Sequence, residues 1–209
     1  MSLGIPKERI VFLGKKDNWW GPAGIMGPCG PDTEMFYWAS ENKAPKKFNN
    51  NDTRWFEIWN DVFMEYNKNK QRKYIKLKQK NVDTGMGVER TSAILQKKES
   101  VFDIEVFKPI LDKIKDIANI KDANNSQLKS IRIIADHLRS ATFILGDEKR
   151  IIPSNVEQGY VLRRLIRKSI RHGKLLDIDD FIIEVAKLMI NIYKNDYDEI
   201  GRYRVFILE

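Results

Sequence analysis

A carboxylate, two glycines and an arginine occur within eight residues at the start of the stretch from Asp83 to Leu95, which reads DTGMGVERTSAIL. Gly85 and Gly87 can adopt backbone conformations closed to residues with a Cβ, and they let a phosphate or a second strand approach the main chain. Arg90 lies near the start of an expected apolar helix, where a guanidinium can hold a phosphate by two parallel hydrogen bonds and unpaired backbone N–H groups also favour an anion. The stretch suggests part of a nucleotide site, and a strand-to-helix turn closed by a surface arginine is an equally good interpretation.

A basic segment in the C-terminal half is the second feature with chemical meaning. The chain has 209 residues and a formal net charge of +8, and the segment from Lys129 to Lys174 contributes +7 of it, with eleven Lys or Arg and four Asp or Glu. Such a block suggests a polyanion partner, because phosphate contacts release counterions and dominate nucleic-acid affinity. The alternative is a helix face that is basic for solubility.

The elements that would position these residues begin with strands. Aromatic and branched residues predict strands over Glu34 to Trp38, Arg54 to Tyr66 and Lys73 to Lys78. A short strand is also expected within Ile5 to Leu13, and Gly21 to Pro31, with four glycines and three prolines, is expected to be an irregular loop. No helical periodicity separates the strands, so we expect antiparallel neighbours, with the 54–66 strand central and covered on both faces.

Two kinds of side chain in this half need partners. Asn60 lies in the middle of an apolar strand, so its amide is either satisfied by neighbouring backbone or offered to a ligand. Trp19 and Trp20 are costly to leave in water, so at least one should be buried or form a pocket wall. Ordinary core packing is the alternative for either tryptophan.

From about residue 101 onward the apolar pattern becomes helical. The expected helices begin at Pro109, at a Ser130 cap with an end at Gly146, at the Ser154–Glu157 capping pattern with an end at Gly173, and at Phe181 with an end at Tyr193. On the third of these helices, residues spaced by four form a basic stripe, made of Arg163, Arg164, Arg167, Lys168 and Arg171. The opposing buried face is expected to hold Leu162, Leu165, Ile166 and Ile170.

Composition excludes several classes of protein. The 42% hydrophobic content is enough for one large domain or two small ones, and no apolar run approaches the roughly 18 residues of a membrane helix. Cys29 is the one cysteine, so an internal disulfide is excluded. His137 and His172 lie far apart in sequence, so no zinc site is expected. The cytoplasm is the expected compartment.

Five sequence blocks, in this order, resemble the alanyl-tRNA synthetases, a family of class II aminoacyl-tRNA synthetases. The blocks are DNWWGPAGIMGPCGPDTEMFYW, RWFEIWNDVFMEYN, VDTGMGVERTSAILQ, IRIIADHLRSATFIL and PSNVEQGYVLRRLIRKSIRHG, which together cover nearly the whole chain. The resemblance implies an α+β fold. An incomplete antiparallel sheet would form the C-terminal part of the class II catalytic domain over residues 1–100, and residues 101–209 would begin the helical tRNA acceptor-stem recognition domain.

The family joins ATP and alanine into an enzyme-bound adenylate and then transfers alanine to the terminal adenosine of the tRNA. By resemblance, Asp83 holds the alanine ammonium, Trp20 lines the amino-acid pocket, and Val62 limits the size of the side chain. Asp83 and Arg90 would be the catalytic pair.

The ATP end of the site is implied in the same way. Arg90 resembles the third class II signature arginine, which contacts the ATP phosphates, and Gly85 and Gly87 would allow the close approach. The family needs Mg²⁺ on the phosphates, but the resemblance assigns no ligand to it here.

For the helical half, Asn155 resembles the asparagine that reads the G·U wobble pair of the tRNA-Ala acceptor stem. A short amide can donate and accept at base edges in the wide, shallow minor groove of A-form RNA. The basic stripe would attract the phosphates. Because Asn155 follows Ser154, a second helix cap is the alternative role.

Departures from the family also set expectations. The chain begins after the first two class II motifs, so half of the adenylation site is expected to be missing and the fragment to be inactive alone. Asp32 stands where many relatives have a second cysteine. The leading interpretation is a fragment of an alanine–tRNA ligase, and the alternatives are a non-catalytic RNA-binding paralogue or one half of a split synthetase. Uncovered sheet edges invite a homodimer.

Overall fold

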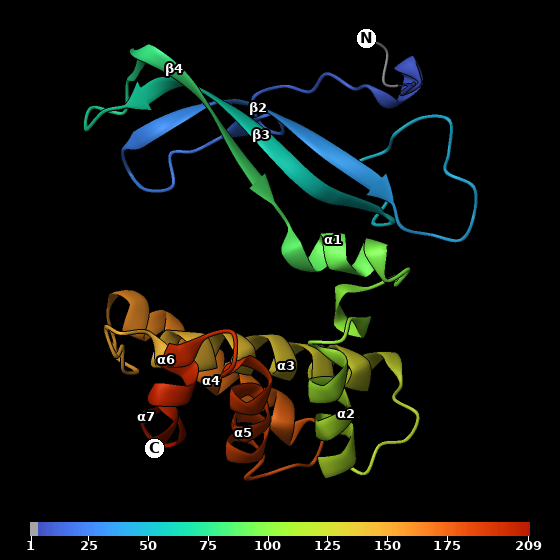
Figure 1. The fold of residues 1–209 in the computed structure, drawn as a ribbon, viewed down its shortest axis with the longest axis vertical. Helices are drawn as coiled ribbons and strands as arrows, with labels where there is room; N and C mark the ends of the chain where they lie inside the picture. The colour runs from blue at the N-terminus through green and yellow to red at the C-terminus, as the bar shows by residue number, and fades with distance from the viewer. Residues whose placement is uncertain (1–3) are drawn as a thin grey trace. The chain divides into compact units, whose positions relative to one another are not determined.

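The computed structural model describes residues 4–209, and these form an α+β arrangement of a four-stranded antiparallel sheet followed by seven α-helices (Figure 1). The chain divides into two compact units. The first, called the sheet unit here, ends at Ile104, and the second, called the helical unit, is Glu105–Glu209. The α+β fold class expected from the sequence is confirmed.

The sheet contains β1 (Trp19–Trp20), β2 (Gly27–Trp38), β3 (Trp55–Lys68) and β4 (Tyr74–Met86) in the order β1-β2-β3-β4. Every neighbouring pair is antiparallel, as the sequence predicted. β4 is followed directly by α1 (Val88–Leu95), so the stretch from Asp83 to Leu95 ends one element and forms the next.

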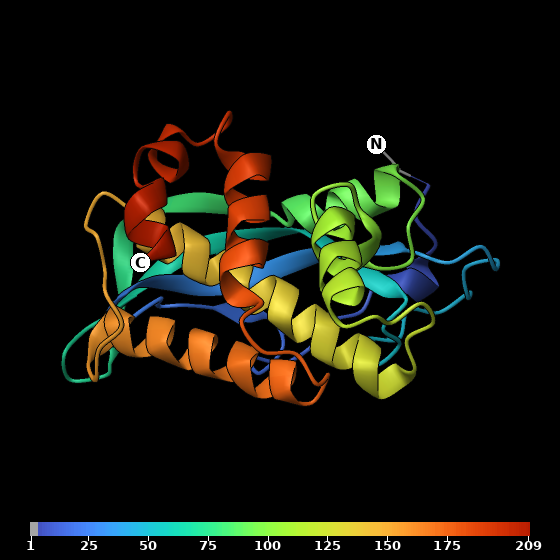
Figure 2. The same cartoon turned by 90° about the horizontal axis from the view of Figure 1, so that it is seen from below.

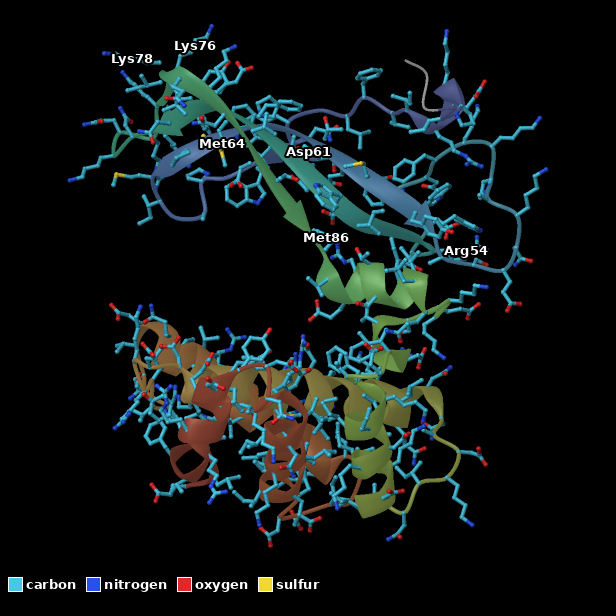
Figure 3. All side chains as sticks on the ribbon, viewed as in Figure 1. Arg54, Asp61, Met64, Lys76, Lys78 and Met86 are labelled. Atoms are coloured by element: carbon cyan, nitrogen blue, oxygen red, sulfur yellow. The ribbon has the colours of Figure 1, made fainter. Side chains whose placement is uncertain are left out.

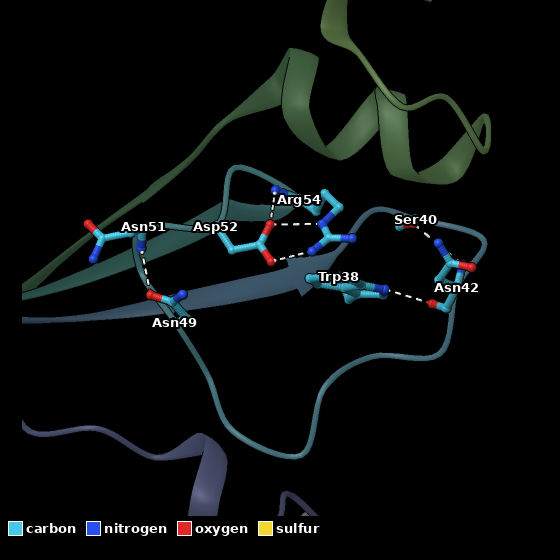
Figure 4. A network of polar contacts seen from close by, with 7 residues as sticks. All are labelled: Trp38, Ser40, Asn42, Asn49, Asn51, Asp52 and Arg54. Atoms are coloured by element: carbon cyan, nitrogen blue, oxygen red, sulfur yellow. Dashed lines mark hydrogen bonds and ion pairs between the residues drawn. The ribbon is translucent and has the colours of Figure 1, made fainter.

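Polar side chains hold the two ends of the connection between β2 and β3 (Figure 4). The Arg54 guanidinium donates two hydrogen bonds to the Asp52 carboxylate, at 2.9 and 2.6 Å, and lies over the Trp38 ring. Trp38 Nε1 donates to the Asn42 carbonyl oxygen at 2.7 Å. These contacts fix the loop at the point where it leaves β2 and enters β3.

Three expectations for this unit are wrong. Residues Ile5 to Leu13 contain the short 3₁₀-helix η1 (Lys7–Arg9) in place of a strand, and β2 already begins at Gly27 inside the expected loop. The early start of β2 is explained at Gly30, where a Cβ would lie 1.8 Å from the Phe63 carbonyl oxygen of β3. That glycine serves a close approach of two strands and not a turn.

The third wrong expectation concerns β3, which is central but is not covered on both faces by the described residues. Val62 and Met64 are buried, whereas Trp59 and Phe63, which point to the other face, are exposed. Trp59, Met35 and Met86 form one cross-strand row on that exposed face, and Met86 lies at the end of β4 in Figure 3.

The helical unit is built around α3. Its elements are α2 (Lys108–Ile117), α3 (Asn125–Gly146), α4 (Glu157–Lys174), α5 (Ile182–Tyr193), α6 (Asp198–Arg202) and α7 (Arg204–Leu208). α3 contacts each of the other five, and Figure 2 shows α4 running beside it. Ile131, Ile134 and Ala135 are fully buried on α3, so this helix forms the centre of the core.

The expected helix caps differ from those that form. α3 begins earlier than predicted, because Asn124 accepts from the Gln127 backbone N–H at 2.9 Å and the Gln127 side chain accepts from the Asn124 backbone at 3.0 Å. Ser130 lies inside that helix and is buried. At α4, Val156 occupies the cap position without a side-chain bond, and the Ser154 hydroxyl bonds to the Val156 backbone instead.

The buried face of α4 is also different from the expectation. Leu162 is buried as predicted, but Ile170 is exposed. Small residues take its place, since Ser169 is fully buried and a Cβ on Gly173 would lie 2.2 Å from the Phe181 ring. Close packing through small side chains is harder to recognise in a sequence than an apolar stripe.

Candidate active site

One face of the sheet, called the candidate face here, carries three of the six residues expected to bind amino acid or nucleotide. Directly opposed residues of antiparallel strands project to the same face. Two adjacent cross-strand rows follow from the strand register, Asp32–Val62–Asp83 and Glu34–Asn60–Gly85. The sheet therefore brings Val62, Asp83 and Gly85 together, and it adds polar residues of β2.

Val62 and Asp83 are the expected residues of the first row. Val62 is 5% exposed and lies between the two aspartates of that row, whereas Asp83 is exposed. A small apolar floor next to an accessible carboxylate suits a small molecule that carries a positive charge. Val62 comes from the central strand, so its position is fixed from both sides.

The two tryptophans have different surroundings. Trp19 packs against Tyr66 and Tyr74, with ring centroids 5.5 and 5.4 Å away, so it belongs to an aromatic cluster. Trp20 pairs with Gly30 on β2, two residues before Asp32, and is 40% exposed. Of the pair, Trp20 is the one available to a ligand.

Arg90 lies in the first turn of α1, as its predicted position near a helix start requires. Its Nη1 donates to the Glu57 carboxylate at 2.7 Å and to the Glu57 carbonyl oxygen at 3.2 Å. Both bonds use the same nitrogen, so Nε and Nη2 make no hydrogen bond to the described part of the chain. The guanidinium is thus held in place while keeping donors for an anion.

Gly85 and Gly87 do not adopt the special backbone conformations expected of them, since neither has a positive φ. The space around each glycine explains its presence better than its backbone conformation does. A Cβ on Gly85 would meet nothing within 4 Å, so the candidate face is open at this point. A Cβ on Gly87 would lie 3.3 Å from Arg90 Cδ, so this glycine makes room for the folded-back arginine side chain.

Asn60 finds its partner in a side chain and not in the backbone. Its Nδ2 donates to Asp32 Oδ2 at 2.9 Å. Asp32 is only 9% exposed, and its other oxygen, Oδ1, is buried without a hydrogen-bond partner among residues 4–209. A buried carboxylate oxygen that the described residues leave unsatisfied is unusual and needs a donor, which a ligand, a water molecule or another part of the protein can supply.

Negative charge accumulates on the candidate face. Burial raises the pKa of Glu34 above its ordinary value, and the neighbouring charges of Glu57 and Asp32 raise it further. The Asn60 amide and the Arg90 guanidinium partly offset this rise. The face therefore favours a cation next to the carboxylates and an anion next to Arg90.

Sequence reasoning missed Asp32, Glu34 and Glu57 as site residues. The signal was present as alternation, because polar residues two apart in the segment DTE share one face of a strand. Glu57 and Asn60 belong to a strand in which a register shift lies opposite Met35 and Phe36. Such a shift changes which residues share a face, and it cannot be read from one strand alone.

The basic stripe lies on α4 as expected. Arg164, Arg167, Lys168 and Arg171 are exposed, and Arg163 is half-buried and lies over the Tyr160 ring. Asn155 is exposed just before the helix, and the alternative of a second cap is wrong, because no side chain caps α4.

The electrostatics of the same helix are positive. Burial lowers the pKa of His172, and the charges of Lys168, Arg171, His137 and Lys129 lower it further. His172 Nδ1 lies 3.0 Å from Ser130 Oγ on α3. A histidine whose protonation is opposed by its neighbours marks a surface suited to an anion.

The described residues contain neither a metal-binding cluster nor a membrane-spanning helix. Within residues 4–209, no group of three or more His, Cys, Asp or Glu side chains is arranged to hold a metal ion. No helix in the same part of the chain is long and apolar enough to cross a membrane.

The family model and the individual relatives that match this chain are all tRNA synthetases. The family "tRNA synthetases class II (A)" matches residues 1–209. Alanine–tRNA ligase of Treponema denticola is 51% identical over 99% of this chain and 35% of its own length. The ligase of Borrelia hermsii is 46% identical over 99% of this chain and 35% of its own length. The chain thus spans about 35% of the length of these curated relatives.

Proposed function

This chain belongs to the class II tRNA synthetases, and from that membership we propose that it is the part of an alanine–tRNA ligase that holds alanine and the phosphates of ATP and begins the tRNA-binding helices. The observation that carries the proposal is the candidate face. In one cross-strand row, the accessible carboxylate of Asp83 lies beside the small apolar side chain of Val62. In the next row, Gly85 leaves open space, and Arg90, which is hydrogen-bonded to Glu57, follows it in the chain.

The amino-acid end is proposed at the row that contains Val62 and Asp83. Asp83 accepts a hydrogen bond from the alanine ammonium and so orients the substrate. Val62 lies under the methyl group, and Trp20 forms one wall. A buried valine floor leaves little depth for a longer side chain, which supports selection of a small amino acid.

The phosphate end is proposed at Gly85, Gly87 and Arg90. The class II family uses ATP, and its triphosphate needs both close backbone approach and positive charge. The open space over Gly85 supports the first, and the free donors of Arg90 support the second. Alanine held by Asp83 would point its carboxylate along the strands toward the α-phosphate, where attack forms the adenylate and releases pyrophosphate.

Mg²⁺ fits the same end of the candidate face. This ion is usually bound by one or two carboxylates together with substrate phosphates and water, so a site with three protein ligands is not required. We propose that Glu57 and Glu34 would hold it, since burial and, after it, the charges of Glu57 and Asp32 raise the pKa of Glu34, and a cation would neutralise that carboxylate charge. The bound ion would supply neutralisation of the phosphate charge. No zinc is proposed.

The helical unit is proposed to begin the acceptor-stem reader. Asn155, exposed and not used as a cap, would meet the G·U pair of tRNA-Ala in the minor groove. The exposed stripe on α4, Arg164, Arg167, Lys168 and Arg171 together with Arg163, would contact the phosphates. We assign residues 1–100 to the catalytic domain and 101–209 to the tRNA domain, and the change of compact unit after Ile104 supports this division.

Assembly and location are proposed from the same reasoning. Within residues 4–209 no strand pairs with the outer edge of β4, and such an edge can pair with a strand of a second copy, which supports a homodimer. Work in translation supports the cytoplasm as the location. Light scattering at two protein concentrations tests the dimer.

The function is tested by alanine-dependent exchange of pyrophosphate into ATP, with the complete synthetase that contains this chain. We expect exchange with alanine, and its loss in Asp83→Asn. Asp61→Asn is the matched control, because Asp61 makes the same change on the opposite face of the same sheet. Binding of tRNA without any exchange would instead favour the non-catalytic RNA-binding protein, and exchange only after addition of a second chain would favour a split synthetase.

A further inference from the structure

Asp32 combines burial with an unsatisfied charge. The side chain is 9% exposed, Oδ2 accepts from Asn60 at 2.9 Å, and Oδ1 is buried without a partner in the described part of the chain. Leaving a carboxylate oxygen unsatisfied in this way costs the desolvation of that oxygen. The cost is recovered only when something outside residues 4–209 donates to it.

The strand register indicates where that donor comes from. Asp32 and Asp83 are the two ends of one cross-strand row, with Val62 between them. The outer strands of such a row are roughly 10 Å apart, twice the spacing of neighbouring strands. Both carboxylates project to the candidate face, so Val62 has a carboxylate on each side.

The two carboxylates of this row decide which kind of cation fits between them. An ammonium has three donors and no acceptor, and one carboxylate cannot satisfy all three. Mg²⁺ is usually bound by one or two carboxylates together with substrate phosphates, and the phosphates are proposed beside Gly85, Gly87 and Arg90 and not over Val62. A primary ammonium on a small molecule therefore fits better than a metal ion.

We propose that Asp32 is a second binding residue for the α-ammonium of the amino-acid substrate, which lies over Val62 and donates to Asp83 on one side and to Asp32 Oδ1 on the other. This inference rests on the proposed function. Asn60 is the positioning residue, because its amide holds Oδ2 and leaves Oδ1 without a donor from the described residues. The carboxyl group of Asp32 is buried before substrate arrives, so the site is prepared for a cation and disfavours an analogue with a neutral hydroxyl group in place of the ammonium.

The test measures the contribution of the ammonium itself. The probes are alanyl sulfamoyl adenosine, a non-hydrolysable adenylate analogue, and its propionyl counterpart, which lacks only the amino group. Calorimetry with the complete enzyme gives both affinities for wild type and Asp32→Asn. Asparagine keeps an oxygen for the Asn60 amide and places an NH₂ donor where Oδ1 lies, so packing is preserved while the acceptor is lost.

We expect Asp32→Asn to weaken the alanyl analogue on the order of 10- to 100-fold, the value of a hydrogen bond to a charged group. Affinity for the propionyl analogue should stay unchanged. Asp61→Asn, the same change on the opposite face in the neighbouring strand and labelled in Figure 3, should alter neither affinity.

Equal weakening of both analogues would make Asp32 a structural residue and overturn the proposal, as would an unchanged preference for the alanyl analogue. Asp32→Ser, read out in the same way, replaces Asp32→Asn where the asparagine variant does not fold. A wild-type enzyme that shows no preference for the alanyl analogue would contradict the proposed function itself. A preference in wild type that persists in the variant would overturn the role of Asp32 alone.

Discussion

The sheet unit and the helical unit use their apolar side chains in different ways. Of the described residues, six buried apolar side chains lie in the sheet unit and twenty in the helical unit. The sheet unit leaves Trp59, Phe63 and Val82 exposed, whereas α3 of the helical unit is enclosed by its neighbours. The helical unit is stabilised by its own core, whereas the sheet unit leaves large apolar side chains of its strands exposed.

The polar groups show the same contrast. In the sheet unit, Asp32 is buried with an unsatisfied oxygen and Glu34 lies among carboxylates. In the helical unit, the buried hydroxyls of Thr142 and Ser169 donate to carbonyl oxygens one turn earlier in their own helices, at 2.9 and 3.0 Å. Buried polar atoms without a hydrogen-bond partner occur in both units, Arg163 Nε and the Tyr193 hydroxyl among them, but within residues 4–209 the carboxylate oxygen in this state is Asp32 Oδ1, in the unit in which we propose the chemistry.

The largest expected effect on stability comes from one glycine of the sheet, with a second glycine as its control. Gly30→Ala places a Cβ 1.8 Å from the Phe63 carbonyl oxygen, so we expect loss of stability of the sheet unit on the order of 4 kcal/mol or more. Gly85→Ala meets nothing within 4 Å and should leave stability unchanged while raising the KM for ATP. Tryptophan fluorescence measures the first effect, because all five tryptophans lie in the sheet unit. A stable Gly30→Ala protein would contradict the strand packing.

The next largest effects come from shortening buried apolar side chains, which should lower the stability of the helical unit more than that of the sheet unit. Ile134→Ala removes a fully buried side chain of α3 and should lower the free energy of unfolding of the helical unit by about 2–5 kcal/mol. Val62→Ala removes less apolar surface and should cost roughly 1–2 kcal/mol. Chemical denaturation followed by circular dichroism at 222 nm reports the helices, and fluorescence reports the sheet.

The valine variant also carries a functional expectation. A deeper floor should let amino acids larger than alanine support pyrophosphate exchange. Unchanged amino-acid selectivity in Val62→Ala would remove Val62 from the pocket, whatever the variant does to stability.

Acid should weaken the helical unit through His172. The pKa of His172 is lowered in the folded state, so its contribution to stability is present above the unfolded value near 6.5 and is lost as pH falls through the folded value. His172→Gln should remove this loss of stability below pH 6.5, measured by thermal unfolding at 222 nm. An identical pH profile in the variant and wild type would contradict the assignment.

The smallest expected effect is the pH dependence of stability through Glu34 in the sheet unit, and its sign is opposite to that of His172. The pKa of Glu34 is raised in the folded state, so its contribution to stability is present below the unfolded value of 4.5 and is lost as pH rises through the folded value. Glu34→Gln should therefore be slightly more stable than wild type at neutral pH and equal to it below pH 4.5, by fluorescence-detected unfolding. A less stable variant at neutral pH would mean that the carboxylate cluster does not repel.

Local patterns predicted the elements well. The helices expected at Pro109 and at Phe181 to Tyr193 form as α2 and α5, and the strand expected over Arg54 to Tyr66 forms as β3. Each of these segments carries its own periodicity, and neighbouring segments do not alter it. Family membership and the α+β fold class followed from the order of the blocks.

Pairings between distant segments could not be predicted in the same way. Ser130 has the residue type of a cap, but Asn124 and Gln127 form a better reciprocal pair earlier in the chain. Asp32 and Asn60 are 28 residues apart, and their contact depends on a strand register that includes shifts. The roles of Asp83, Arg90 and Asn155 toward substrates stay predictions.

The most direct test of the central claim is a crystal structure of the complete enzyme with alanyl sulfamoyl adenosine. We predict that its ammonium lies over Val62, within hydrogen-bond distance of Asp83 and Asp32, and that its sulfamoyl group lies beside Arg90. An analogue bound on the face that carries Trp59 and Met86, or with its ammonium away from Asp83, would contradict the assignment of the candidate face.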